Sequence, residues 1–378
     1  MSIYTEEHQI FQNSIARFNE KEILPFIDSW EKQSDFPSEI FKKLGDNGFL
    51  SILIPEQLGG VGGDYLLASA WIEEFGKIPA VGFTTAINMH SLVITPALAK
   101  FGSKAALDKW LPGALSGEKI GAYAFTEPNA GSDLTQIQTK AVREGESYRI
   151  NGSKIFITNG ARADFVIVLA KTAAEKGYQG YTSFVVDTKS PGFSVSRKLS
   201  KLGWHSSDTA ELNFVDVIVP KEMVLGDEGA GWIQSMSSLE WERIMLTLNS
   251  IAGARECLKS TLEYVKNRVV FGKPLIEFEL TKDKLSNYSA RLIAARSYAH
   301  NCVKLINSKK YCRKEASLAK LNACELAIEI ANGCLQLHGG YGYTTEFRPE
   351  RWLRDLRLNT IGGGTSEIMA RIAAKEIF

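Results

Sequence analysis

The stretch that decides the fold class is SYRINGSKIFIT, residues 147–158, which holds two short runs of β-prone residues around Asn151 and Gly152. An Asn-Gly pair between two such runs is typical of a β-hairpin turn. Further β-rich runs follow at 164–171, 181–187 and 211–219, with no helical pattern between them. Several short strands without intervening helices predict an antiparallel barrel or sandwich in the middle of the chain.

Helical patterns lie on both sides of this β-rich segment. Upstream, residues 36–50 and 65–76 carry apolar residues at spacings of three and four, and a glycine-rich loop separates them. Downstream, a helical apolar stripe runs through 281–308, with Thr281 as the expected N-cap. A second long helix is expected over 314–337, where two glycines follow.

The sequence therefore predicts a mostly α-helical protein with a central β domain. We expect an N-terminal helical domain over residues 1–120 and the antiparallel β barrel or sandwich over 121–230. The long striped helices of residues 231–378 predict a C-terminal four-helix bundle.

The composition narrows the class of protein further. The 378 residues are 44% hydrophobic and carry 44 Lys and Arg against 43 Asp and Glu, a net charge of +1. This balance creates no global field that would favour nucleic acid or an anionic membrane. No apolar run reaches the roughly 18 residues of a membrane span. We therefore expect neither nucleic acid nor a membrane span.

The start of the chain and its cysteines favour a cytoplasmic location. The first residues lack the basic and apolar regions of a secretory signal. The five cysteines are odd in number and form no Cys-x-x-Cys pair, which favours reduced thiols. The five histidines are scattered without the spacing of metal ligands, so no metal site is expected.

Residues 122–133, AYAFTEPNAGSD, are the first chemical candidate. Small residues at 129–132 predict a tight turn with exposed backbone N–H groups, and Thr126 and Ser132 add hydroxyls. Such a turn can hold a phosphate or the polar edge of a ring, although an ordinary β-turn has the same composition. The chain has no glycine-rich Rossmann motif and no P-loop.

Taken together, seven short motifs resemble those of the acyl-CoA dehydrogenase family along nearly the whole chain. They are residues 122–133, KIFITNG at 154–160, KLGWH at 201–205, VIVP at 217–220, Arg268-x-x-Phe271-Gly272, Gln336-x-x-Gly339-Gly340 and Gly364-Thr365-Ser366. Each motif alone is weak, but together they follow the family's order and intervals. The resemblance implies an FAD-dependent dehydrogenase of fatty-acid β-oxidation that forms a homotetramer and passes electrons to an electron-transfer flavoprotein.

The resemblance also implies which residues bind FAD. Residues 156–158 resemble a Trp-Ile-Thr run beside flavin N5, with Phe156 in place of the tryptophan. Residues 268–272 and 336–340 resemble segments that a neighbouring subunit lends to the adenosine and pyrophosphate, a task that suits the planar guanidinium of Arg268. The implied cofactor-binding residues are Tyr123, Phe125, Thr126, Ser132, Phe156, Ile157, Thr158, Arg268, Phe271, Gln336, Gly339, Gly340, Thr365 and Glu367.

The position of the catalytic base departs from many members of the family. They carry a glutamate immediately before Gly-Thr-Ser, where this chain has Gly363. Isovaleryl-CoA and long-chain members take their glutamate from the first helix after the β domain, which matches Glu242. Its neighbours three and four residues away are Ser238, Leu239, Met245 and Leu246. This largely apolar strip favours a base with a raised pKa over the alternative, a salt-bridged surface residue.

The activity implied by the resemblance is α,β-desaturation of an acyl thioester. Glu242 removes the α proton while the β hydrogen leaves as hydride to flavin N5, and the N–H of Gly363 donates to the enolate oxygen. The implied substrate-binding residues are Ser132, Glu240, Arg243, Gly363 and Gly364. Gly362 and Gly363 also predict extra room for long or branched acyl groups.

Other activities on the same fold stay open. One is a dehydrogenase of an acyl or aminoacyl group on a carrier protein, and another is a catalytically silent member of the family. A flavin monooxygenase is disfavoured because a base candidate is present.

Overall fold

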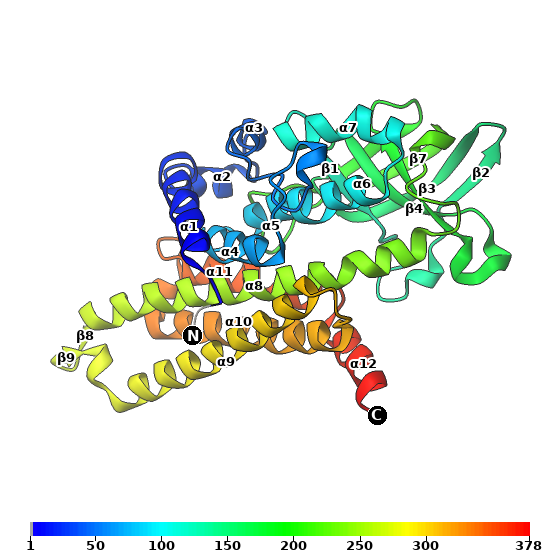
Figure 1. Ribbon diagram of the computed structural model, residues 1–378. Helices are drawn as coiled ribbons and strands as arrows, with labels where there is room; N and C mark the ends of the chain where they lie inside the picture. The colour runs from blue at the N-terminus through cyan, green and yellow to red at the C-terminus, as the bar shows by residue number, and fades with distance from the viewer. Residues whose placement is uncertain (1–2) are drawn as a thin grey trace.

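The computed structural model describes residues 3–378 and shows helices, then strands, then helices along the chain (Figure 1). Figure 1 shows the β domain at one end of the long helix α8, with the N-terminal helices beside it and the C-terminal helices below. This arrangement confirms the predicted fold class of a mostly helical protein with a central β domain. The exact domain boundaries stay a prediction.

The N-terminal helices enclose a dense apolar core. They are α1 (Glu6–Phe18), α2 (Ile27–Gln33), α3 (Glu39–Asp46), α4 (Tyr65–Phe75), α5 (Val81–Met89), α6 (Thr95–Phe101) and α7 (Lys104–Ser116). The continuous stretch Val81–Phe101 is long and apolar enough to cross a membrane by length and composition, yet 89% of its most apolar 18-residue window is buried inside the fold. Such burial is what the core helix of a globular protein shows.

The β domain is a curled sheet with one apolar core of its own. Its strands are β1 (Gly121–Ala124), β2 (Lys140–Glu144), β3 (Ser147–Thr158), β4 (Phe165–Lys171), β5 (Tyr181–Asp187), β6 (Phe193–Lys198) and β7 (Thr209–Pro220). The strand order is β1-β4-β2-β3-β7-β6, with β5 paired to β4. Most pairs are antiparallel as expected, but β4 runs parallel to both β1 and β2. The crossovers between these strands are long enough to permit parallel pairing.

The expectation of a hairpin turn at Asn151 and Gly152 is wrong. Strand β3 runs through both residues, and its pairing with β7 shifts register between Ile150 and Gly152, which is a bulge. A Cβ on Gly152 would lie 2.4 Å from Oγ1 of Thr139, so only glycine allows this close approach. The hairpin turn instead joins β2 to β3.

The C-terminal region is a bundle centred on one helix. It comprises α8 (Gly231–Asn267), the hairpin of β8 (Val269–Val270) and β9 (Lys273–Pro274), α9 (Glu279–Asn307), α10 (Arg313–His338), α11 (Pro349–Arg357) and α12 (Ser366–Ile377). Helix α10 packs against the other four helices. The predicted stripe of α9 is buried from Leu285 to Cys302, but Thr281 lies inside the first turn because α9 begins at Glu279. All five cysteines are buried and unpaired.

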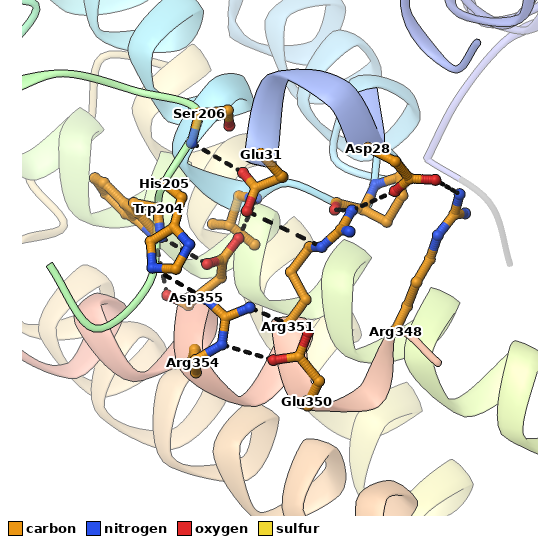
Figure 2. A network of polar contacts seen from close by, with 12 residues as sticks. Asp28, Glu31, Trp204, His205, Ser206, Arg348, Glu350, Arg351, Arg354 and Asp355 are labelled. Atoms are coloured by element: carbon orange, nitrogen blue, oxygen red, sulfur yellow. Dashed lines mark hydrogen bonds and ion pairs between the residues drawn. The ribbon is translucent and has the colours of Figure 1, made fainter. Parts of the chain in front are cut away.

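One buried carboxylate joins all three regions (Figure 2). Asp355 of α11 accepts hydrogen bonds from the backbone N–H of Val81 at 2.9 Å and of Trp204 at 2.6 Å. Val81 begins α5, so the carboxylate also sits at a helix N-terminus, where negative charge is favoured. Glu31 of α2 lies in the same network and accepts from the N–H of Ser206. Burial and the charge of Glu31 raise the pKa of Asp355 to about 7.

We expect Asp355→Asn to lower the free energy of unfolding by about 1–3 kcal/mol, because an amide group can accept with one oxygen only and leaves a buried N–H unpaired. Urea unfolding followed by fluorescence measures the change. Asp108→Asn is the matched control, since Asp108 forms only an exposed pair with Lys104, and it should change stability by less than about 0.5 kcal/mol. Equal stability of the two variants would contradict the role assigned to Asp355.

Candidate active site

The Glu242 side chain lies in an apolar environment on α8. It is half-buried, and its neighbours Met245 and Leu246 are buried. Among the described residues, the carboxylate accepts no hydrogen bond and forms no ion pair within 4 Å. Burial raises the pKa of Glu242, and the charges of Arg243 and Lys320 offset part of that rise. A carboxylate with a raised pKa and no partner is a candidate general base.

Gly363 lies directly against this carboxylate. A Cβ at position 363 would stand 3.3 Å from Oε1 of Glu242 and 2.7 Å from Cδ1 of Leu246. The expected extra room is therefore wrong at Gly363, whose side-chain space these two residues fill, whereas a Cβ on Gly362 would meet only the carbonyl oxygen of Leu358, at an ordinary contact distance of 3.7 Å. Within residues 3–378 the N–H of Gly363 has no hydrogen-bond acceptor, so it is free to bind a ligand oxygen.

Two cations hold the glycine loop that contains Gly363. Lys320 of α10 is buried and donates to the carbonyl oxygens of Asn359 at 2.8 Å and Gly364 at 2.7 Å. Arg243 reaches the carbonyl oxygen of Gly363 at 3.5 Å. Sequence reasoning missed Lys320. Its signal was a lysine among small, buried neighbours on one helix face, such as Ala316 and Ala323.

Two aromatic residues of the predicted cofactor segment lie near Glu242. Tyr123 of β1 packs against Phe125 with the two rings tilted by 52° and their centroids 4.2 Å apart. The Tyr123 hydroxyl is buried without a hydrogen-bond partner, and its pKa is raised by burial and by the charge of Glu242. An unpaired buried hydroxyl beside a candidate base is an available donor for a bound ligand.

A buried ion pair fixes the turn that follows β1. Lys154 contacts Glu127 at 2.9 Å and also donates to the carbonyl oxygens of Phe125 and Leu169. Burial lowers the pKa of Lys154 to about 8, while Glu127 accepts two backbone N–H groups and keeps a lowered pKa despite its burial. The pair anchors the segment that carries Thr126.

The remaining candidate residues of the β domain differ in which of their groups are accessible to a ligand. Phe156 has φ +62° and is 64% exposed, so its ring faces outward from the domain. Thr158 is half-buried, whereas the Ile157 side chain packs into the β core and leaves only its backbone to a ligand. Ser132 is exposed near the same turn.

The residues just after the glycine loop form the N-terminus of helix α12. Thr365 is the N-cap of α12, and its hydroxyl accepts from the N–H of Ile368. Glu367 is exposed in the first turn of that helix. Glu240, half-buried on α8, forms no close ion pair with Arg243 in the described part of the chain, and burial raises its pKa.

A second group of candidates lies at the far end of α8. Arg268, Gln336, Gly339 and Gly340 line a cavity of about 510 Å³. A Cβ on either glycine would meet nothing within 4 Å, so their backbone is open to a ligand. Phe271, at the tip of the β8–β9 hairpin, is 97% exposed and adopts φ +49°. The structure thus brings these residues together at the end of α8 that leads into β8, whereas Glu242 lies 26 residues before Arg268 on the same helix (Figure 1).

Comparison with known families covers nearly the whole chain. Residues 5–118, 122–217 and 229–378 match the N-terminal, middle and C-terminal domains of acyl-CoA dehydrogenases. This chain belongs to the acyl-CoA dehydrogenase family. Its members are oxidoreductases, and the chain carries the family's fold throughout.

Individual members of the acyl-CoA dehydrogenase family are similar to this chain over most of their length. The mitochondrial long-chain specific acyl-CoA dehydrogenase of Mus musculus is 38% identical over 99% of this chain and 87% of its own. An acyl-CoA dehydrogenase of Bacillus subtilis is 37% identical over 98% of both chains. The crystal structure of the Geobacillus kaustophilus acyl-CoA dehydrogenase superposes with a TM-score of 0.96, at 37% identity and 99% coverage of both chains.

We expect Gly363→Ala to destabilise the protein by about 1–3 kcal/mol more than Gly145→Ala. Both glycines have positive φ, +66° and +61°, so both variants carry the left-handed strain. Only the Cβ at 363 also collides with Leu246, which adds an overpacking cost. Denaturant unfolding of the two variants measures the difference, and equal losses would show that the space beside Glu242 is not filled.

Proposed function

We propose that this protein is an FAD-dependent acyl-CoA dehydrogenase in which Glu242 removes the α proton of an acyl thioester. The single observation that carries the assignment is the contact between Glu242 and position 363. The chain has glycine where many relatives have their base, and the carboxylate of Glu242 reaches the space that a side chain there would begin to fill.

The surroundings of Glu242 suit proton abstraction. The carboxylate has no direct partner to neutralise it, and burial raises its pKa toward the range of an efficient base. The free N–H of Gly363 supports a role in binding the thioester oxygen, where negative charge develops as the α proton leaves. Ser132, Glu240, Arg243 and Gly364 are proposed to bind other parts of the substrate.

The residues present fit a flavin dinucleotide in two places. Tyr123 offers an unpaired hydroxyl and Phe156 an exposed ring in the β domain, with Thr126 and Thr158 nearby in the same segments. Arg268 forms no ion pair in the described chain and shares its cavity with the open backbone of Gly339 and Gly340, a donor set that suits a pyrophosphate. When bound, FAD would supply the acceptor for the β hydride.

The separation of these two places supports an oligomer. Tyr123 lies near Glu242, and Arg268 follows on α8 26 residues after Glu242, which is about 39 Å along the helix axis. One dinucleotide cannot reach both places within one chain, so a second copy would supply residues 268–272 and 336–340. Exposed apolar side chains on the bundle, Phe271, Leu280 and Ile293, offer surface for such a partner. We propose a homotetramer.

The resemblance to the family supports the electron acceptor, whereas the free, buried cysteines support the compartment. We propose that electrons pass to an electron-transfer flavoprotein and that the protein acts in the cytoplasm, in fatty-acid β-oxidation. A prolyl acyl carrier protein oxidase, AnaB, superposes with a TM-score of 0.94 at 29% identity over 99% of both chains. A carrier-bound acyl group is therefore the second candidate substrate.

We expect Glu242→Gln to retain FAD while turnover falls by at least about 10²-fold, because the amide keeps the shape of the side chain but cannot accept the proton. In the parent protein the rate of flavin reduction should rise with pH through a pKa above that of an ordinary glutamate, since only the ionised carboxylate is a base. Stopped-flow reduction across pH measures both. Near-normal turnover of Glu242→Gln would contradict the assignment of Glu242 and make Glu240 or Glu367 the next candidates for the base.

The proposed function itself is tested by anaerobic titration of the purified protein with thioesters. We expect a yellow multimer whose flavin absorbance is bleached by an acyl-CoA from a panel of straight, branched and carrier-linked acyl groups. Bleaching by carrier-linked groups alone would favour the second candidate. A colourless monomer that takes up no added FAD would contradict the proposal.

A further inference from the structure

Lys320 is a buried cation whose hydrogen bonds hold both ends of a loop. Its side chain is 1% exposed, and its ammonium group binds the carbonyl oxygens of Asn359 and Gly364. These two carbonyls stand at the start and the end of the segment that contains Gly362 and Gly363. One ammonium group from α10 therefore fastens both ends of a loop that three consecutive glycines would otherwise leave flexible.

The loop is also tied to the helix that carries the base. The Asn359 side chain donates to Oγ of Ser250 on α8 at 2.8 Å, and Arg243 of α8 approaches the carbonyl oxygen of Gly363. The position of Gly363 beside Glu242 thus depends on contacts from α8 and α10 together.

Lys320 and the Glu242 carboxylate both lie beside position 363, but they form no ion pair with each other. A Cβ at 363 would lie 3.6 Å from Cε of Lys320 and 3.3 Å from Oε1 of Glu242. The hydrogen bonds of Lys320 go to loop carbonyls, and no ion pair with Glu242 forms within 4 Å. A direct ion pair would hold the carboxylate in its charged form too strongly for a good base.

We propose that Lys320 is a positioning residue: it fixes the Asn359–Gly364 loop so that the N–H of Gly363 faces the substrate, and it places a positive charge near Glu242 without binding it. The role of Glu242 in this inference rests on the proposed function. The loop-fixing part rests on the contacts alone.

The charged and titratable groups around Glu242 are few. Arg243 comes from α8, Lys320 from α10 and Tyr123 from β1, and the loop 361–364 contributes no titratable side chain. Both cations lower the pKa of Glu242, so removal of the Lys320 charge raises it. The proton-accepting form then appears at higher pH.

The first measurement is hydrogen exchange by mass spectrometry on peptides that cover residues 358–366 of the purified holoprotein. We expect exchange in Lys320→Met to be at least about ten times faster than in the parent, because both end carbonyls lose their donor. Lys314→Met, on the same helix but paired only with Glu315 at its surface, is the matched control and should leave the loop unchanged. Unchanged exchange in Lys320→Met would overturn the proposal.

The second measurement is the pH dependence of flavin reduction by a reactive acyl-CoA. We expect its midpoint to rise by about one pH unit in Lys320→Met and to stay near the parent value in Lys320→Arg, which keeps the charge. A merely structural lysine would lower the rate without moving the midpoint, and an unmoved midpoint in Lys320→Met would overturn the proposal. If Lys320→Met does not fold, Lys320→Gln, which can donate but is neutral, replaces it against Lys320→Arg.

The two measurements separate this inference from the proposed function. If no thioester reduces the flavin of the parent protein, the proposed function has failed, whereas the exchange experiment still decides whether Lys320 holds the loop.

Discussion

The geometry of the candidate site depends on how Asp355 locks the three regions together. Tyr123 comes from a strand, Glu242 from a long helix and Gly363 from a loop near the C-terminus, so no local segment can fix their distances. Asp355 connects the helix before that loop to the start of α5 and to the backbone at Trp204 (Figure 2). Because each bond is to a backbone N–H, the carboxylate fixes main chain rather than a mobile side chain. A shift of about one ångström at this junction would change the distances between the residues of the candidate site.

Buried charges in this protein are held mainly by backbone carbonyls and amides. Lys154 and Lys320 donate to main-chain oxygens, and Glu127 and Asp355 accept from main-chain nitrogens. A buried charge that is fully hydrogen-bonded to the main chain has less need of an opposite charge. Glu242 differs from these four residues, since its carboxylate has neither a main-chain donor nor an ion-pair partner in the described chain. That difference in solvation separates a structural carboxylate from a candidate base, and it raises the pKa of Glu242.

Features that depend on the spacing of nearby residues can be predicted from the sequence. Features that depend on contacts between distant parts of the chain cannot. The order of helices and strands, the buried stripe of α9 and the apolar strip around Glu242 all follow from spacings within a few residues. The bulge at Gly152 was mistaken for a turn because the strand that pairs through it lies some 60 residues away in the chain. Neither Lys320 nor Asp355 stands out in the sequence, and lysine and aspartate are rarely buried. Only the folded chain shows the carbonyl and amide groups that make their burial possible.

Under the proposed function, the two candidate base positions, 242 and 363, are not independent of each other. A side chain at 363 would begin 3.3 Å from the Glu242 carboxylate, so a glutamate there would bring a second carboxylate into the same region, and repulsion between the two would raise the pKa of one of them. The present positions of Glu242 and Leu246 therefore favour glycine at 363, because a Cβ there would require both side chains to shift. Leu246 is the closer of the two, since it fills the same space and would collide at 2.7 Å. Moving the base to 363 would require Glu242 to lose its charge, Leu246 to become smaller and the loop to leave φ +66°. The glycine at 363 is thus part of the machinery of Glu242, since it leaves room for the carboxylate and keeps a free N–H beside it.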